Sequence, residues 1–319
     1  MVTRLDQLFK SSVAVSSLKV YRRAWVLFQQ AMSSMGINFT GFRDLPVSVN
    51  HLMLFIGYLS HLGFAAASIT SYSSAIAYIH KLLNLPDPSK LFVVQKLIAA
   101  CNKLNKSMDS RLPITIVILQ RLCHSVDHTI SSHYNKQLFH TMFVISFFGL
   151  MRLGEVTRDK SGHVPLSFDQ IQFSDSALII TIRHFKHNVS LKPIQIVLPA
   201  QQDKNICPVF QMIAYIRLRG TNPGPLFCYQ DSLPVSRSYF SKNLKNCLKY
   251  CGLNTTLYKS HSFRIGSASY YHQLGFSDAQ IRLLGRWNSN AFLKYIRTQQ
   301  IGISLGCSTT PLAFPVSWP

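Results

Sequence analysis

The last third of the chain contains a histidine and an arginine three residues apart, followed by a tryptophan and a tyrosine. These residues are His261, Arg264, Trp287 and Tyr295, and a second arginine, Arg152, lies far upstream. Arginine forms paired, charge-assisted hydrogen bonds to phosphate oxygens and does not lose its proton. A histidine can move a proton near neutral pH, and an indole N–H can donate a hydrogen bond. The set indicates cleavage of a phosphodiester with a tyrosine nucleophile.

This chemistry makes demands on the elements that carry the side chains. A tyrosine hydroxyl, with a pKa of about 10, is a weak nucleophile unless positive groups stabilise the developing charge. His261 and Arg264 are spaced to project from one side of a helix near its N-terminus, where phosphate binding is favoured. Arg152 follows an apolar run that predicts a buried helix, and Glu155, the only glutamate of the chain, can orient its guanidinium. Each residue alone is more often structural, so the prediction rests on their combination.

The composition indicates a polyanionic partner. The chain has 319 residues, 47% of them hydrophobic, and 33 basic against 12 acidic residues give a net charge of +21. The excess is present in both parts: residues 1–110 hold 11 basic and 4 acidic residues, and residues 111–319 hold 22 and 8. Double-stranded DNA would explain such a distribution. A basic surface that only aids solubility remains the alternative.

The cysteines and the apolar segments bear on the cellular compartment. The seven cysteines are scattered, their number is odd, and no signal peptide precedes them, which favours a reducing compartment. The most apolar stretch, Met142 to Met151, is too short to span a bilayer, so we expect no membrane partner.

The periodicity of apolar residues predicts a mostly α protein with a small β-sheet. We expect a helical domain over residues 1–106, a linker over 107–113, a mixed α+β domain over 114–300 and an extended tail over 301–319. Short strands are predicted in the second domain at Asp169–Phe173, Leu178–His184 and Ile194–Leu198. Helices are predicted there at Ile114–Val126, Asn135–Leu150, Cys207–Arg219, Arg237–Cys251, Ser262–Leu274, Ser277–Leu284 and Asn290–Arg297.

A second candidate for DNA contact is the last helix of the first domain. Lys96, Lys103 and Lys106 are spaced seven and three residues apart, so they share one side of that helix. This side can lie on phosphates. An ordinary solvated helix face is the alternative interpretation.

Several stretches around these residues match a known family. They include Gly149-Leu150-Met151-Arg152-Leu153-Gly154-Glu155-Val156, His261-Ser262-Phe263-Arg264-Ile265-Gly266-Ser267-Ala268, Leu284-Gly285-Arg286-Trp287 and Tyr295-Ile296-Arg297. With them the chain resembles the tyrosine recombinases, or phage integrases, and in particular members from eukaryotic mobile elements. The resemblance is strong over residues 112–300. It implies a helical core-binding domain followed by a catalytic domain.

The resemblance also implies a role for each candidate residue. Arg152 and Arg264 would clamp the scissile phosphate, and His261 would act in proton transfer. Trp287 would donate a hydrogen bond to the phosphate, and Tyr295 would attack phosphorus to form a 3′-phosphotyrosyl link. Tyr295 follows Trp287 by eight residues, one fewer than is common in bacterial and phage members.

The acid that protonates the leaving 5′-oxygen would be a lysine in the connection between the second and third strands. Lys186 matches it, and Arg183 and Lys192 flank this candidate. A lysine suits the role because, unlike arginine, it can give up its proton.

As a family member the protein would act on double-stranded DNA as a homo-tetramer, in the nucleus, and without a cofactor. The sequence shows no clustered carboxylates for a pair of metal ions and no P-loop, so we expect neither metal nor ATP to take part. Two alternatives remain: a DNA-binding protein of the same fold that does not cut, and a strand relaxer similar to type IB topoisomerases.

Overall fold

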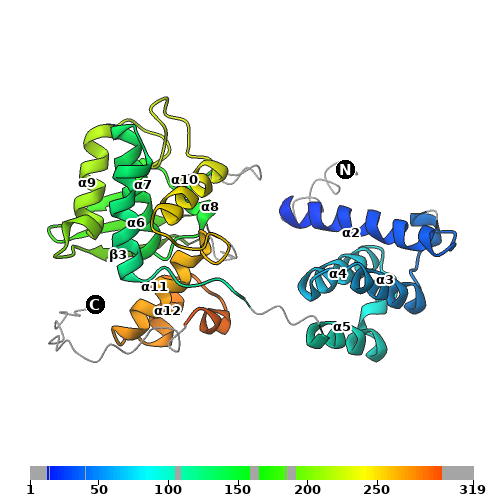
Figure 1. Cartoon of the computed structure of the whole chain (residues 1–319). Coiled ribbons are helices and arrows are strands. Elements are labelled where there is room, and N and C mark those ends of the chain that lie inside the picture. The colour runs from blue at the N-terminus through cyan, green and yellow to red at the C-terminus, as the bar shows by residue number, and fades with distance from the viewer. Residues whose placement is uncertain are drawn as a thin grey trace. The chain divides into compact units, whose positions relative to one another are not determined.

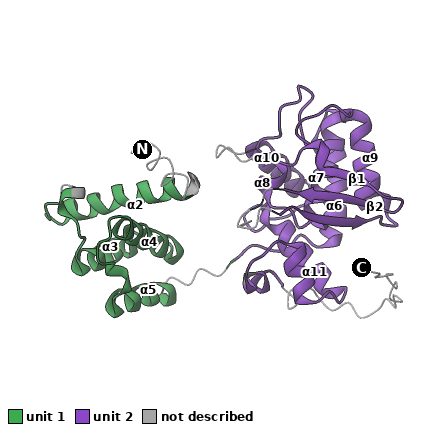
Figure 2. Ribbon diagram, turned by 180° about the vertical axis from the view of Figure 1, so that it is seen from behind, with its two compact units in different colours: residues 1–109 green, residues 110–319 purple. Residues whose placement is uncertain are grey.

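The chain folds into two compact units, residues 1–109 and residues 110–319 (Figure 2). The structure is a computed structural model. It describes residues 13, 15–39, 41–104, 109–158, 165–183, 185 and 192–296. Each unit has a hydrophobic core of its own, so we describe them separately.

Unit 1 is helical throughout its described part, as predicted. Its helices are α2 (Val15–Ser34), α3 (Val49–His61), α4 (Ala66–Leu82) and α5 (Phe92–Leu104), with short 3₁₀ turns at Phe42–Asp44 and Pro88–Lys90 (Figure 1). The core contains Phe28, whose ring meets Phe39 and Phe55 edge to face at centroid distances of 5.0 and 5.3 Å. Such aromatic contacts add to the free energy gained by burial and fix how α2 and α3 pack.

A buried histidine joins two segments of this unit. His80, at the end of α4, is fully buried. Its Nε2 accepts a hydrogen bond of 2.9 Å from the backbone N–H of Val47, so its Nδ1 carries the proton and donates at 2.8 Å to the carbonyl of Ile76. The neutral imidazole therefore ties the loop before α3 to α4.

Unit 2 is built around helix α7 (His133–Phe148), whose last eight residues, Thr141–Phe148, are all buried. Helices α6 (Ile116–Thr129), α9 (Pro208–Arg219) and α11 (His261–Gln273) pack against α7, as Figure 1 shows. Helix α10 (Arg237–Tyr250) packs on α6. Burial of the C-terminal half of α7 on all sides gives a rigid base to the segment that follows it.

The sheet has three antiparallel strands in the order β1 (Ile171–Phe173), β2 (Ala177–Ile182) and β3 (Ile194–Pro199). The strand expected at Asp169–Phe173 is shorter than predicted, because Phe168–Gln170 forms a 3₁₀ turn. The side chain of Gln170 holds this turn by accepting from the N–H of Ser167 at 2.9 Å and donating to the carbonyl of Thr181 at 2.6 Å.

The last described segment of unit 2 follows α11. It consists of α12 (Asp278–Leu284) and η5 (Asn290–Tyr295), so the helix predicted over Asn290–Arg297 is a 3₁₀ helix in its described part. Helix α11 lies against the start of the unit at Gly266, where an added Cβ would stand 1.7 Å from the carbonyl oxygen of Ile114. Only glycine allows this close approach.

The predicted fold class is confirmed: the protein is mostly helical with one small antiparallel sheet. Within the residues that the structure describes, no helix is long and apolar enough to cross a membrane. Lys106, Lys186 and the tail over 301–319 lie outside the described residues.

Candidate active site

The candidate residues of unit 2 come from three segments that are far apart in the sequence. Arg152 directly precedes the short helix α8 (Leu153–Val156), which follows α7. His261 is the first residue of α11, and Arg264 lies in its first turn. Trp287 follows α12, and Tyr295 ends η5. Their positions therefore depend on how these segments pack.

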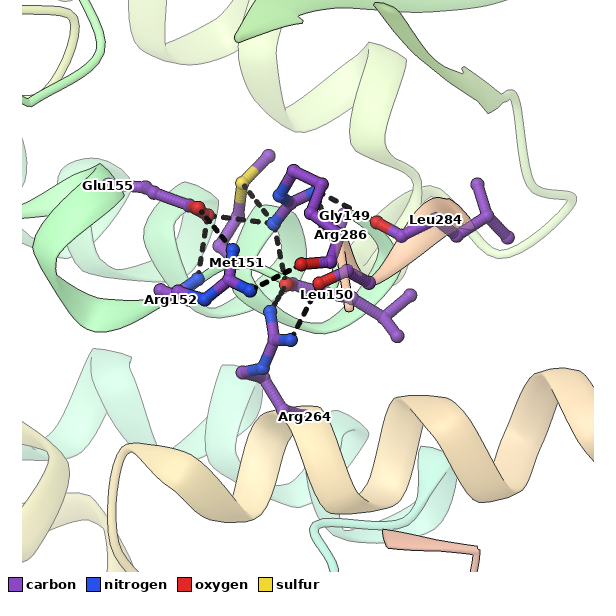
Figure 3. A network of polar contacts seen from close by, with 9 residues as sticks. Gly149, Leu150, Met151, Arg152, Glu155, Arg264, Leu284 and Arg286 are labelled. Atoms are coloured by element: carbon purple, nitrogen blue, oxygen red, sulfur yellow. Dashed lines mark hydrogen bonds and ion pairs between the residues drawn. The ribbon is translucent and has the colours of Figure 1, made fainter. Parts of the chain in front are cut away.

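Glu155 is the buried anion that joins two of the segments (Figure 3). Its carboxylate accepts from Arg152 twice, at 2.8 Å from the backbone N–H and at 3.1 Å from Nη1. It also accepts from Nη2 of Arg286 at 2.7 Å. The other end of the Arg152 guanidinium, Nη2, donates at 2.6 Å to the carbonyl of Arg286. Arg152 and Arg286 are thus linked through Glu155 and through a main-chain carbonyl.

Arg264 reaches the same place from α11. It is buried, and its Nη1 donates to the carbonyl of Leu150 while its Nη2 donates at 2.8 Å to the carbonyl of Gly285 (Figure 3). The carbonyl of Leu150 also accepts from Arg286 at 2.8 Å. The guanidinium groups of Arg264 and Arg286 are therefore held by main-chain oxygens of the segments before α8 and after α12.

The cluster of Arg152, Glu155, Arg264 and Arg286 carries more positive than negative charge. Burial would raise the pKa of Glu155, but the charges of Arg286 and Arg152 together bring it below its ordinary value. Burial and the charges of Arg286 and Arg152 lower the pKa of Arg264 far below its ordinary value. Arginine keeps its proton in proteins, so the lowered pKa marks a cation that is desolvated and repelled by its neighbours, which an incoming anion would stabilise.

Aromatic contacts continue from Arg264 to the candidate nucleophile. The Arg264 guanidinium lies over the Trp287 ring at 4.3 Å from its centroid. The Trp287 ring stacks on Tyr295 at 5.5 Å and an interplanar angle of 29°. On its other side, Tyr295 meets His261 edge to face at 4.9 Å. Four candidate residues therefore form one continuous set of contacts.

The backbone takes unusual conformations where these contacts form. Leu150 and Arg286 both have positive φ values, of 43° and 56°, which side-chain-bearing residues rarely adopt. Between Leu284 and Arg286, an added Cβ on Gly285 would stand 1.7 Å from the Trp287 ring. Glycine at this position allows Trp287 to lie flat against the chain and to face Arg264 and Tyr295.

Helix η5 is held to α11 by one side chain. The single hydroxyl hydrogen of Ser269 is shared between the carbonyl of Ile265, 2.9 Å from Oγ, and the carbonyl of Tyr295, 3.1 Å from Oγ. Phe292 and Tyr295 of η5 also pack in a small apolar cluster with Ala268 and Tyr271. The nucleophile candidate is therefore placed by packing of a short 3₁₀ segment on α11.

The structure thus brings together the candidate residues Arg152, Glu155, His261, Arg264, Trp287 and Tyr295. Lys186 falls outside the described residues. Lys96 and Lys103 are both exposed on α5 in unit 1.

Sequence reasoning missed Arg286. Arg286 lies nine residues before Tyr295, the spacing that is common in bacterial and phage members, whereas Trp287 lies only eight residues before it. This spacing could have pointed to Arg286 from the sequence.

Sequence reasoning also missed a basic face on α10. Three exposed lysines, spaced three and four residues apart, share one side of this helix: Lys242, Lys245 and Lys249. We call them the α10 lysines. In the described residues, no group of three or more His, Cys, Asp or Glu side chains is placed to hold a metal ion.

Comparisons by sequence give no match, either to models of protein families or to curated proteins. Comparisons by structure do. The lambda integrase fragment 75–356, solved as a dimer bound to a COC′ core site, is similar with a TM-score of 0.62 and 14% identity, over 94% of this chain and 95% of that one. XerH recombinase bound to a palindromic difH substrate is similar with a TM-score of 0.62 and 18% identity, over 87% and 75%.

A third similar structure is the Tn1549 transposon integrase with circular intermediate DNA, with a TM-score of 0.54 and 10% identity. It matches over 87% of this chain and 96% of that one. The match to the lambda integrase fragment covers 94% of this chain, so it extends over both units. This protein therefore has the fold of the tyrosine recombinases.

Proposed function

We propose that the protein is a site-specific DNA recombinase or integrase that cuts and rejoins DNA strands through a 3′-phosphotyrosyl intermediate on Tyr295. The observation that carries this proposal is the continuous contact from Arg264 through Trp287 to Tyr295 and His261. Trp287 contacts both Arg264 and Tyr295, so a phosphate bound by Arg264 would lie within reach of the Tyr295 hydroxyl.

The charge of the cluster favours a phosphodiester as ligand. Arg152, Arg264 and Arg286 are close enough to repel one another, and Glu155 is the carboxylate that pairs with Arg152 and Arg286. Three cations and one anion leave an excess of two positive charges. A phosphodiester contributes one negative charge and gains a second in the transition state, so such a site stabilises the transition state more than the ground state.

In the proposed reaction, the Tyr295 oxygen attacks phosphorus and the bond from phosphorus to the 5′-oxygen breaks. The proton of the tyrosine hydroxyl passes to His261, and the leaving 5′-oxygen takes a proton from Lys186. Arg152 and Arg264 bind the non-bridging oxygens, and the indole N–H of Trp287 donates to one of them. The phosphotyrosyl bond conserves the energy of the broken bond, so rejoining requires neither ATP nor a cofactor.

The partner is double-stranded DNA. The exposed α10 lysines of unit 2 and the exposed Lys96 and Lys103 of unit 1 would contact phosphates. Contacts of this kind set affinity and register rather than base specificity. Binding should weaken steeply as salt rises, because each neutralised phosphate releases counterions.

Strand exchange requires several subunits, and we propose a homo-tetramer on DNA. Lambda integrase has been solved as a tetramer bound to a Holliday junction, and the Tn1549 enzyme comes from a transposon. By the same analogy we propose that this protein serves a mobile element, and a eukaryotic host would place it in the nucleus.

Covalent trapping on a nicked suicide DNA substrate tests the reaction. We expect the wild-type protein to form a covalent adduct that Tyr295→Phe cannot form, although this variant still binds DNA. Tyr270→Phe is a matched control, because Tyr270 is a partly buried tyrosine of α11. Adduct formation by Tyr295→Phe would move the nucleophile to another residue.

DNA binding, plasmid relaxation and strand joining, assayed beside the suicide substrate, separate the alternatives. Tight DNA binding without any adduct would favour a protein of this fold that does not cut. Relaxation of any supercoiled plasmid by the monomer, without joint molecules from two DNAs, would favour a topoisomerase. Joint molecules that depend on a defined site support a recombinase.

A further inference from the structure

Arg286 is buried at the centre of the site, although the proposed reaction gives it no role. Its side chain has no exposed surface. Besides its bond to Glu155, it donates to the carbonyls of Leu284 at 2.8 Å, Leu150 at 2.8 Å and Gly149 at 3.3 Å (Figure 3). These bonds supply Nη1 and Nη2 of its guanidinium with acceptors inside the protein.

The contacts of Arg286 determine the orientation of Arg152. The side chain of Arg286 fixes the Glu155 oxygen that also accepts the backbone N–H of Arg152, and its carbonyl accepts Nη2 of Arg152 at 2.6 Å. The other Glu155 oxygen accepts Nη1 of Arg152. Both terminal nitrogens of Arg152 thus have partners that depend on Arg286. The positive φ of Arg286 lets one residue direct its side chain at Glu155 and its carbonyl at Arg152.

We propose that Arg286 is the positioning residue of the site, which holds Glu155 and thereby sets the Arg152 guanidinium for the scissile phosphate. This inference rests on the proposed function. Arg286 touches neither the phosphate nor the nucleophile in this role, so it acts through Arg152. A guanidinium serves better than an ammonium here, because its fork reaches Glu155 and the main-chain carbonyls at once.

The alternative is that Arg286 serves stability alone. Arg219 provides the comparison, since its guanidinium too donates to main-chain carbonyls, those of Gly220, Asn222, Pro225 and Leu226. It lies on α9, which is not one of the three segments of the site. Loss of either guanidinium removes several hydrogen bonds to main-chain carbonyls, but only loss of Arg286 should disturb Arg152.

A pH profile separates orientation from stability. Arg286 is the first of the charges that lower the pKa of Glu155 against the effect of burial, followed by Arg152 and then Arg264. Without Arg286, burial remains and the pKa of Glu155 rises. Protonation of Glu155 would release Nη1 of Arg152, so the rate of adduct formation should fall at a higher pH than in the wild type.

The experiment measures single-turnover adduct formation on the suicide substrate at saturating protein, with wild type, Arg286→Met, Arg286→Lys and Arg219→Met. Circular dichroism and DNA affinity verify that each variant is folded. We expect Arg286→Met to slow adduct formation by about 100-fold, the effect of misplacing a catalytic group by about 1 Å. The fall in its rate at acid pH should occur at a higher pH than in the wild type. Arg286→Lys should recover part of the rate, and Arg219→Met should match the wild type.

Wild-type adduct with an Arg286→Met rate no lower than that of Arg219→Met would overturn the positioning role and leave the proposed function standing. A slower Arg286→Met rate that falls at the same acid pH as the wild-type rate would also overturn it, because Glu155 would not be the intermediary. No adduct from folded, DNA-bound wild type would overturn the proposed function and this inference with it.

Discussion

Replacement of Glu155 by glutamine should destabilise unit 2 more than any other removal of a single charge. The side chain is 3% exposed and lies 2.7 Å from Nη2 of Arg286 and 3.1 Å from Nη1 of Arg152. Glutamine has nearly the same shape, but its amide nitrogen would face one of these donors and its charge is zero. The guanidinium groups would then remain buried without a counter-charge.

The cost follows from the geometry. Breaking a buried ion pair by removing one partner costs about 3–5 kcal/mol, because the remaining charge stays desolvated. For a unit of this size, each kcal/mol lowers the melting temperature by about 2–4 °C. We therefore expect Glu155→Gln to lower it by on the order of 10 °C.

The effect should depend on pH in one direction. The pKa of Glu155 is lowered from its ordinary 4.5 in the folded protein. A group with a lowered pKa contributes its full stabilisation above its unfolded pKa and loses it as the pH falls through the folded pKa. The difference between wild type and Glu155→Gln should thus be complete at neutral pH and shrink as the pH falls below 4.5.

Urea unfolding and calorimetry over this pH range measure both quantities. The matched control is Asp169→Asn, which removes a 2.6 Å pair with Arg183 whose side chains are 61% and 49% exposed. Exposed pairs contribute about 0–1 kcal/mol, so the control should change little. A Glu155→Gln loss as small as that of the control, or one that persists undiminished in acid, would refute the electrostatic reasoning.

Three further predictions concern other parts of the chain. Gly266→Ala should cost several kcal/mol or prevent folding of unit 2, as measured by urea unfolding, because the new Cβ would lie 1.7 Å from the Ile114 carbonyl oxygen; wild-type stability would show that α11 can shift at no cost. His80→Ala should destabilise unit 1 by about 2–4 kcal/mol, since it leaves the buried N–H of Val47 without its acceptor and opens a cavity; a change below about 1 kcal/mol would contradict this. Replacing the α10 lysines by alanine should reduce the slope of log affinity against log salt by about 3, and an unchanged slope would show that α10 does not contact DNA phosphates.

Much of the fold was predictable because the helices are amphipathic or wholly apolar. The periodic apolar residues of α6 and the continuous apolar run of α7 predict both helices to within two residues at most ends. The segment Asn290–Tyr295 was harder, since its 3₁₀ geometry arises from packing on α11 rather than from its own pattern. Tertiary contacts decide such short elements.

The candidate site could be predicted only in part. The chemistry of Arg152, Arg264 and Tyr295 is visible in their residue types and spacing. The role of Arg286 is not, because its φ of 56° turns an arginine inward at a place where a continuing helix would expose it. Periodicity describes regular elements, and this residue lies in the turn directly after one.

The long sequence separations inside the site have a consequence for the synthesis of the protein. The bonds from Arg264 to Leu150 and from Arg286 to Glu155 join residues 114 and 131 positions apart. Contacts of such separation form late, and chains fold from the N-terminus while they are translated at about 5–20 residues per second. Unit 1 can therefore fold before Arg264 and Arg286 have been translated. A nascent or truncated chain that ends before Arg286 would carry Arg152 and the α10 lysines without the assembled cluster, so the proposed cleavage could begin only after this part of the chain has been translated.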